Sequence, residues 1–232
     1  MNKWYPVHLD MNGRHCVIVG GGHIAVRRVH GLVEAGAKIT VISPHCHSDM
    51  NRLATEGKVR ITLRNYEGED DLKNADLVFA ATNDNIVNRL ITDDARKLQI
   101  PVNDLGDSKL STFIVPAVLR RGRLIMSVST SGASPGLAKR IRNELTACYG
   151  VEYELYVDFL SELREWVAEK VANEQCRAMI FHHVLKFDIL ELIQAEKLHA
   201  FRLWLQIMLE QELQVDEWEQ QLKDYSNNLK TI

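Results

Sequence analysis

Three small residues near the N-terminus have the spacing of a phosphate-binding turn. Gly20, Gly22 and Ala25 form a G-x-G-x-x-A pattern directly after an apolar, β-branched run and before a helical pattern. The first glycine of such a turn permits a tight bend, the second lets a pyrophosphate approach the backbone, and the small third residue lets helix and strand pack closely. Free N–H groups at the helix start attract the phosphates. The pattern predicts a dinucleotide site at Gly20, Gly21, Gly22 and Ala25; the alternative is a glycine-rich turn that binds nothing.

Polar residues after two further strands are also candidates for cofactor contacts. Ser43, Pro44 and His45 follow the second predicted strand, where NAD-binding proteins often carry an acid for the ribose hydroxyls. This chain has neither an acid nor an arginine there, so the position does not choose between NAD and NADP. Thr82 and Asn83 end the next core strand. They either contact the cofactor or cap the helix that follows, and the sequence leaves both readings open.

A cationic segment occupies the middle of an otherwise acidic chain. Between residues 108 and 143 there are seven lysines and arginines and no acid, so this stretch carries +7 and the remainder carries −3 − 7 = −10. Such a distribution favours an anionic ligand at this place, although a solvated basic face is the alternative. The seven cations are Lys109, Arg120, Arg121, Arg123, Lys139, Arg140 and Arg142.

The elements that must position these residues follow from the hydrophobic pattern. Strands are predicted at 15–19, 38–43, 59–63, 77–81 and 100–102, helices at 24–35, 50–56 and 85–98, and a further short strand at 5–9. The strands are continuously apolar rather than alternating, which is typical of a parallel sheet covered on both faces. The prediction is an α/β chain with an N-terminal Rossmann-type domain at residues 1–111.

Two further parts are predicted after the Rossmann-type domain. Residues 112–150 form a small α+β unit, with strands at 113–115 and 124–129 and a helix capped by Ser134. Residues 151–232 contain no glycine or proline and repeat apolar residues at helical spacing, so an all-helical C-terminal region is expected. This region carries sixteen acids against eight lysines and arginines.

Composition narrows the class of protein. The chain has 232 residues, of which 46% are hydrophobic and 25% charged, as in ordinary globular proteins. No apolar run is long enough to cross a bilayer and the N-terminus lacks a signal-peptide core, so a cytoplasmic protein without membrane association is expected. The four cysteines lack C-x-x-C spacing. His45 and His47 flank Cys46, but alternate side chains diverge at a strand end, so no metal site is predicted.

Four segments, taken together, resemble one known family. They are VIVGGGHIAVRRVHGLVEAGAKITVISP, AATND, IPVND and FIVPAVLRRGRLIMSVSTSGASPGLAKRIR, and they occur in this order over about residues 5–145. They resemble the precorrin-2 dehydrogenase / sirohydrochlorin ferrochelatase family. The resemblance implies NAD-dependent oxidation of precorrin-2 to sirohydrochlorin during sirohaem biosynthesis. It also implies a homodimer formed through the middle unit.

The resemblance also assigns site residues. Cofactor contacts of the family correspond to His23 and Ile24 and to Pro44 and His45. Asn103, which follows the last predicted strand of the sheet, is a further cofactor-binding candidate. Because the substrate is a polycarboxylate, arginines and helix-start hydroxyls are expected to hold it. The substrate-binding candidates are Arg120, Arg121, Arg123, Ser129, Ser131, Ser134, Lys139 and Arg140. Ser129 corresponds to a serine that is modified in some relatives.

One departure from the family concerns the second activity. Bifunctional members carry an aspartate three residues after the loop asparagine, and this chain has Gly106 there. Asp104 and Asp107 flank that glycine and are the candidate catalytic residues. The chain therefore resembles the stand-alone, dehydrogenase-only branch, with the bifunctional enzyme as the alternative. A nucleotide-sensing regulator that contacts nucleic acid is a more distant alternative. Nucleic-acid binding is not expected, because the whole chain is acidic and its cations are not interleaved with aromatics.

Overall fold

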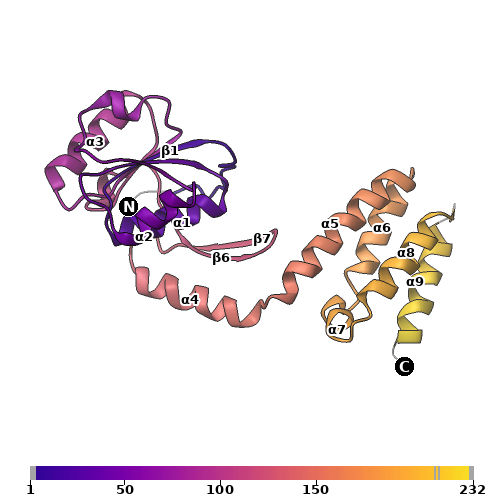
Figure 1. The fold of residues 1–232 in the computed structure, drawn as a ribbon. Coiled ribbons are helices and arrows are strands. Elements are labelled where there is room, and N and C mark those ends of the chain that lie inside the picture. Colours follow the sequence, from indigo (N-terminus) through magenta and orange to yellow (C-terminus); the bar gives the residue numbers. More distant parts are fainter. Residues whose placement is uncertain (1–3, 212, 214, 230–232) are drawn as a thin grey trace. The chain divides into compact units, whose positions relative to one another are not determined.

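The computed structural model describes residues 4–211, 213 and 215–229, and it divides into two compact units. The first unit comprises the residues up to Val115 together with 131–133, and the second comprises 116–130 and the residues from Ser134 onward. Figure 1 shows a sheet flanked by helices in the N-terminal part and a group of helices in the C-terminal part. The middle segment and the C-terminal helices fall in the same unit, so the predicted division at residues 111 and 150 stays a prediction.

The first unit is built around a five-stranded parallel sheet. Its strands are β1 (His15–Val19), β2 (Lys38–Ile42), β3 (Arg60–Thr62), β4 (Leu77–Ala80) and β5 (Val102–Asp104), in the order β3-β2-β1-β4-β5. The order reverses between β1 and β4, since the chain leaves β1 toward β2 and later returns to the other side of β1. Ligands of such sheets bind in the crevice outside the carboxyl ends of the strands at this point. The predicted α/β Rossmann-type class is confirmed.

Helices cover both faces of the sheet, which explains the continuously apolar strands. The helices are α1 (His23–Glu34), α2 (Ser48–Thr55) and α3 (Asn85–Lys97), with short 3-10 helices η1 (Glu69–Leu72) and η2 (Ser108–Leu110). Alternate strand residues belong to two separate apolar clusters. Ile18 packs in the cluster that contains Val29 of α1 and Met50 of α2. Val17 packs in the cluster that contains Ile91 of α3.

The second unit consists of a hairpin and helices. The hairpin pairs β6 (Ala117–Arg121) with β7 (Leu124–Val128), and the helices are α4 (Pro135–Cys148), α5 (Glu152–Lys170), α6 (Glu174–Val184), α7 (Ile189–Gln194), α8 (Leu198–Leu209) and α9 (Val215–Leu229). Ser134 caps α4 as predicted, because its Oγ accepts a hydrogen bond of 3.2 Å from the N–H of Leu137. Helices α5 to α9 share one apolar core around Phe159, Phe201 and Trp218.

Two predicted strands are wrong. Residues 5–9 form no strand; Pro6 lacks an N–H donor, and Tyr5, Val7 and Leu9 are exposed. Residues 113–115 also form no strand. The ring of Phe113 packs edge-on against Phe79, with centroids 5.3 Å apart, so this segment is held by the core rather than by strand pairing. Apolar content alone cannot separate these two situations.

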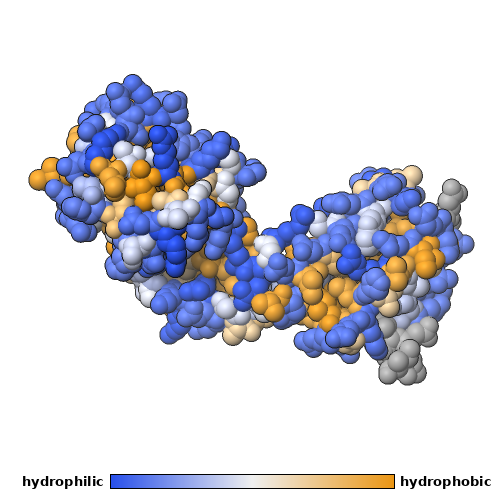
Figure 2. All heavy atoms as spheres, in the orientation of Figure 1, coloured by the Kyte–Doolittle hydropathy of each residue, from blue (hydrophilic) through white to orange (hydrophobic). Residues whose placement is uncertain are grey.

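Hydrophilic residues cover most of the face of the molecule drawn in Figure 2, and apolar side chains reach the surface in both units. Exposed large apolar residues include Ile24, Ile86 and Leu90 in the first unit and Leu203 and Ile207 in the second. Among the residues that the structure describes, no helix combines the length and the apolar character needed to span a bilayer.

Candidate functional site

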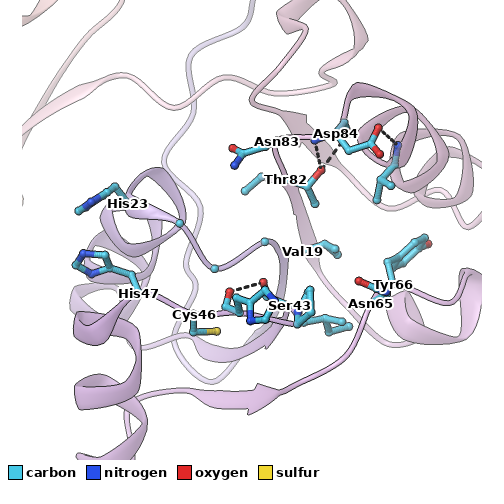
Figure 3. A pocket seen from close by; sticks show the side chains of 18 residues that line it. Val19, His23, Ser43, Cys46, His47, Asn65, Tyr66, Thr82, Asn83 and Asp84 are labelled. Atoms are coloured by element: carbon cyan, nitrogen blue, oxygen red, sulfur yellow. Dashed lines mark hydrogen bonds between the residues drawn. The ribbon is translucent and has the colours of Figure 1, made fainter.

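A cleft of about 720 Å³ lies at the carboxyl ends of β1, β2 and β4. Figure 3 shows the side chains around it, with Val19 in the middle. Thr82 and Asn83 lie on one side of this residue and Ser43 and Cys46 on another. The glycine turn and the loops after β2, β3 and β4 supply the lining. The cleft therefore sits at the reversal of strand order, where this fold class binds its ligands.

The three consecutive glycines do different things. Gly20 has a φ of +118°, and a Cβ atom on it would overlap the carbonyl oxygen of Ala81. A Cβ on Gly21 would overlap the carbonyl oxygen of His45. A Cβ on Gly22 would meet nothing within 4 Å. The fold itself therefore requires the first two glycines, whereas the open space at Gly22 is available to a ligand.

The start of α1 is open toward a ligand. Gly22 is its N-cap residue and makes no side-chain cap hydrogen bond. The starts of α2 and α3 are closed by side chains. His47 Nδ1 accepts from the N–H of Asp49 at 3.2 Å, and Asp84 Oδ1 accepts from the N–H of Ile86 at 2.8 Å. Because unpaired N–H groups at a helix start bind phosphate, the residues present fit the pyrophosphate of a dinucleotide at α1.

The loop after β2 is held by its own contacts. Ser43 Oγ donates a hydrogen bond of 2.7 Å to the carbonyl oxygen of His45. The imidazole rings of His23 and His47 lie with their centroids 4.0 Å apart. Burial raises the pKa of the Cys46 thiol, so this side chain stays protonated at neutral pH. In the part of the chain that the structure describes, no cluster of three or more potential metal ligands is present.

The segment after β4 contacts α3 through Thr82 and caps α3 through Asp84. Thr82 Oγ1 donates to Asn88 Oδ1 at 2.7 Å, and Asn88 Nδ2 donates back to the Thr82 carbonyl oxygen at 3.1 Å. This exchange ties the end of β4 to α3. The cap itself is Asp84. Because Asp84 is the cap, the interpretation in which Thr82 or Asn83 caps α3 is wrong. Both residues line the cleft instead.

Three predicted cofactor residues do not line the cleft. Ile24 is 54% exposed and Ala25 is completely buried, where its small side chain lets α1 pack on the sheet. Asn103 is buried, and its Nδ2 donates to the Phe113 carbonyl oxygen at 2.9 Å. Its Oδ1 makes no hydrogen bond within the described residues. The cofactor residues brought together are Gly20, Gly21, Gly22, His23, Ser43, Pro44, His45, Thr82 and Asn83.

The two candidate catalytic aspartates have different environments. Asp104 is 4% exposed, and its Oδ1 accepts from the backbone N–H groups of Gly106 at 2.8 Å and of Asp107 at 2.9 Å. Its carboxylate therefore holds the turn after β5. Asp107 is exposed and caps η2 through one oxygen, which accepts from the N–H of Lys109 at 2.9 Å. Asp107 is accordingly the aspartate that solvent and a ligand can reach.

Several predicted substrate residues already have protein partners. Arg121 Nε donates to the Tyr149 carbonyl oxygen at 3.1 Å. Arg123 pairs with Asp158 at 3.2 Å, and Arg140 pairs with Glu144 at 3.4 Å. Except for Ser131, all the predicted substrate residues belong to the second unit; they are Arg120, Arg121, Arg123, Ser129, Ser134, Lys139 and Arg140. Their role toward a substrate stays a prediction.

Sequence reasoning missed two side chains of the loop after β3. Asn65 and Tyr66 line the cleft, together with Cys46, His47 and Asp84. The signal was available, because a loop that follows a parallel strand lies at the same edge of the sheet as the other loops. Strand β3 has only three residues and is only partly buried, so the sequence gave a weak indication that the loop after it would line the cleft.

The ion pair between Arg64, in this loop, and Asp71, in η1, predicts a pH dependence of the free energy of unfolding. The Arg64 guanidinium beside Asp71 holds the pKa of that carboxyl below its usual range, although burial opposes this effect. A carboxyl with a lowered folded pKa stabilises the fold above its unfolded pKa of about 3.9 and loses that contribution as the pH falls through the folded value. The Asp71→Asn variant should therefore melt below wild type at pH 7, and the difference should shrink at acidic pH. Thermal melts across this pH range test it; a constant difference contradicts the linkage.

The overlap at Gly21 predicts a structural defect. Gly21→Ala should reduce the free energy of unfolding by about 1–3 kcal/mol, because the new methyl group displaces the backbone at His45. Urea denaturation measures this loss, and Gly22→Ala is the matched control because its Cβ enters open space. Equal stability of the two variants would show that the turn relaxes freely.

Comparisons with known proteins agree with this architecture. Residues 7–117 match a family described as putative NAD(P)-binding, and residues 121–147 match the sirohaem biosynthesis protein central family. A precorrin-2 dehydrogenase of Priestia megaterium is 39% identical over 160 residues, which cover 69% of this chain and 78% of the relative. The solved structure of SirC, precorrin-2 dehydrogenase, superposes with a TM-score of 0.65 at 31% identity and covers 96% of this chain and 100% of that one.

Longer relatives also match. A siroheme synthase of Nitrosospira multiformis is 34% identical over 214 residues, which cover 90% of this chain but 45% of the relative. The chain thus spans less than half the length of that relative. Fold, cleft geometry, family matches and the well-covered Priestia relative agree, and the chain belongs to the precorrin-2 dehydrogenase family.

Proposed function

We propose that this protein is an oxidoreductase that uses NAD to convert precorrin-2 to sirohydrochlorin in sirohaem biosynthesis. The observation that carries the proposal is the uncapped start of α1 beside the open space at Gly22, within the cleft at the strand reversal. The names of the Priestia relative and of the SirC structure support the choice of reaction.

The lining of the cleft favours NAD over NADP. In this fold the start of α1 would hold the pyrophosphate and the loop after β2 would hold the adenosine ribose, so the loops after β4 and β5 would be left for the nicotinamide half. Among the described residues, no lysine or arginine lines the cleft. The 2′-phosphate of NADP would therefore have no lysine or arginine of the cleft lining to pair with. When bound, the oxidised nicotinamide supplies the hydride acceptor, and the chain positions the substrate and removes a proton.

We assign the proton to Asp107. Oxidation of precorrin-2 would release one proton for each hydride that a bound nicotinamide accepts, and a base of this chain would take that proton. Asp107 lies in the loop after β5 and keeps one carboxylate oxygen free of the contact with Lys109. Asp104 acts as a positioning residue, because its oxygen holds the N–H groups of Gly106 and Asp107.

The cationic segment supplies charge for the polycarboxylate substrate. Lys139 is exposed on the first turn and a half of α4, and Ser134 caps that helix. Arginine and lysine side chains bind carboxylates through charge-assisted hydrogen bonds. Arg121, Arg123 and Arg140 must exchange or share their present partners to do so.

The loop after β5 supports dehydrogenation without metal insertion. A Cβ atom on Gly106 would lie 2.8 Å from Asn85 Oδ1 and 3.2 Å from Asn88 Nδ2. The loop is therefore packed around a glycine, and an aspartate there would have to push Asn85 aside. We propose that the protein lacks the ferrochelatase activity that the longer siroheme synthases suggest as the alternative.

The hairpin of the second unit supports a homodimer. Within the described residues, β6 and β7 pair with each other and with no further strand. A two-stranded sheet is marginally stable by itself, and its unpaired edges are sites for pairing with another chain. We propose that two copies associate through this hairpin. A cytoplasmic location is also proposed, since all four cysteines are free thiols.

One assay tests the proposed reaction. Purified protein, precorrin-2 and NAD should yield NADH and the sirohydrochlorin spectrum at equal rates, with no sirohaem when Fe²⁺ is added. NAD that stays oxidised in the presence of precorrin-2 would overturn the proposal. Rapid iron insertion would instead favour the bifunctional alternative.

A further inference from the structure

The loop between β3 and η1 brings two side chains into the cleft that the proposed reaction has not used. Figure 3 shows Asn65 and Tyr66 together on one side of the cleft, away from His23 and His47. Strand β3 is the neighbour of β2. Since the adenosine ribose of a bound dinucleotide lies at the end of β2, the base that it carries extends toward this loop.

Tyr66 is fixed in position by its hydroxyl group. The hydroxyl donates a hydrogen bond of 3.0 Å to Asp94 Oδ2, and Asp94 is 3% exposed. Burial and the Asp94 carboxylate raise the pKa of Tyr66, so the hydroxyl remains a donor at neutral pH. The ring packs against the apolar cluster that contains Val19 and Ile42, both of which line the cleft. A rigid aromatic and aliphatic surface of this kind suits a flat heterocycle.

Asn65 is held at the rim of this surface. Arg64 NH1 donates to the Asn65 carbonyl oxygen at 3.0 Å and to Asp71 Oδ2 at 2.9 Å. The N–H of Glu67 donates to the same Asp71 oxygen at 2.9 Å. These contacts order the backbone on both sides of Asn65. Its side-chain amide makes no hydrogen bond to any residue that the structure describes, so the amide is available to a ligand.

An asparagine amide matches one purine edge better than the others. Its oxygen accepts from the adenine N6 amino group while its nitrogen donates to N7. Hypoxanthine presents two acceptors on the same edge, O6 and N7, and a single amide cannot donate to both with this geometry. An asparagine whose backbone is held beside a base-stacking surface is therefore a means of selecting adenine.

We propose that Asn65 and Tyr66 form the adenine subsite of the cleft, in which Tyr66 packs against the base and Asn65 selects adenine over hypoxanthine. This inference rests on the proposed use of NAD. It makes the loop after β3 a determinant of cofactor specificity.

Dissociation constants for NAD and for nicotinamide hypoxanthine dinucleotide test the role of Asn65 in the full chain. Wild type should prefer NAD by about 10-fold, the lower part of the range for a bidentate base contact. Asn65→Ala should lower this ratio to about 1. Asn83→Ala is the matched control, since Asn83 lines another side of the cleft and should leave the ratio unchanged. A wild-type ratio near 1, or a ratio that survives in Asn65→Ala, would overturn the assignment.

Fragments of the cofactor test Tyr66. Tyr66→Leu should weaken ADP-ribose by about 10-fold, as expected for lost base stacking, and should leave inhibition by nicotinamide mononucleotide unchanged. Tyr66→Phe keeps the ring and should bind ADP-ribose as wild type does, even if loss of the Asp94 contact lowers its melting temperature. Equal weakening of both fragments in Tyr66→Leu would refute a base subsite. If wild type binds no NAD at all, the proposed function fails; if it binds NAD without choosing the base, only this inference fails.

Discussion

Replacing Gly22 by aspartate is expected to abolish NAD binding while leaving the fold at least as stable as wild type. Gly22 is the N-cap residue of α1, its φ of −80° suits any residue, and a side chain there enters open space. Aspartate is a better N-cap than glycine, so the free energy of unfolding should rise by a few tenths of a kcal/mol. The same carboxylate occupies the place of the pyrophosphate.

The binding loss in Gly22→Asp should be at least about 10²-fold, because two like charges about 4 Å apart in a partly solvated site repel by several kcal/mol. Calorimetric titration with NAD and urea denaturation measure the two effects separately. Gly22→Asn is the matched control, since it adds nearly the same bulk and a helix cap without the charge. Its affinity should fall less than that of the aspartate variant. Near-normal NAD affinity in Gly22→Asp would remove the pyrophosphate from the start of α1.

Replacing Asp107 by asparagine is expected to lower kcat for precorrin-2 by about 10²–10⁴-fold, the usual contribution of a general base. Asparagine keeps the oxygen that accepts from the N–H of Lys109, so η2 and the loop should stay in place. The affinity for NAD should not change. Single-turnover reduction of NAD by precorrin-2 measures the chemical step directly.

Asp104→Ala, which removes the accepting oxygens altogether, provides the contrast to Asp107→Asn. Asp104 is buried and holds two backbone N–H groups, so its substitution should reduce the free energy of unfolding by about 1–3 kcal/mol. Its effect on turnover should follow from the altered loop and should appear in NAD binding as well. Full turnover in Asp107→Asn would show that placing the substrate against the cofactor suffices and that no side chain of this loop takes the proton.

Much of the first unit could be predicted from local patterns. The glycine turn, the apolar runs and the helical periodicities between them correspond to β1, α1, β2, β4 and α3 to within a few residues. Continuous apolar strands require helices on both faces, and the two clusters around Ile18 and Val17 meet that requirement. The predictions failed at residues 5–9 and 113–115, where apolar residues pack or lie exposed without a strand partner.

The candidate site was predictable where a local rule existed. Gly22 and Ser134 act at the start of the helix that directly follows each of them, so their place in the local sequence predicts their roles. The difference between Asp104 and Asp107 has no such signal. Asp104 is the last residue of β5 and Asp107 lies three residues later. Asp104 is buried because its carboxylate accepts N–H groups of the turn that follows, whereas Asp107 is exposed.

By itself, the sequence determined the class of fold, the phosphate-binding turn and the family, because each depends on residue types at short, regular separations. The tertiary structure decided which glycine leaves room for a ligand, which helix start remains uncapped, and that Asn65 and Tyr66 reach the same cleft as Gly22. The ends of β1 and β3, which precede Gly22 and the loop with Asn65 and Tyr66, are more than forty residues apart in the chain. Parallel pairing of β1 with β2 and of β2 with β3 brings the carboxyl ends of these strands to the same edge of the sheet. No pattern of neighbouring residues in the sequence predicts that the side chains at these ends lie close together.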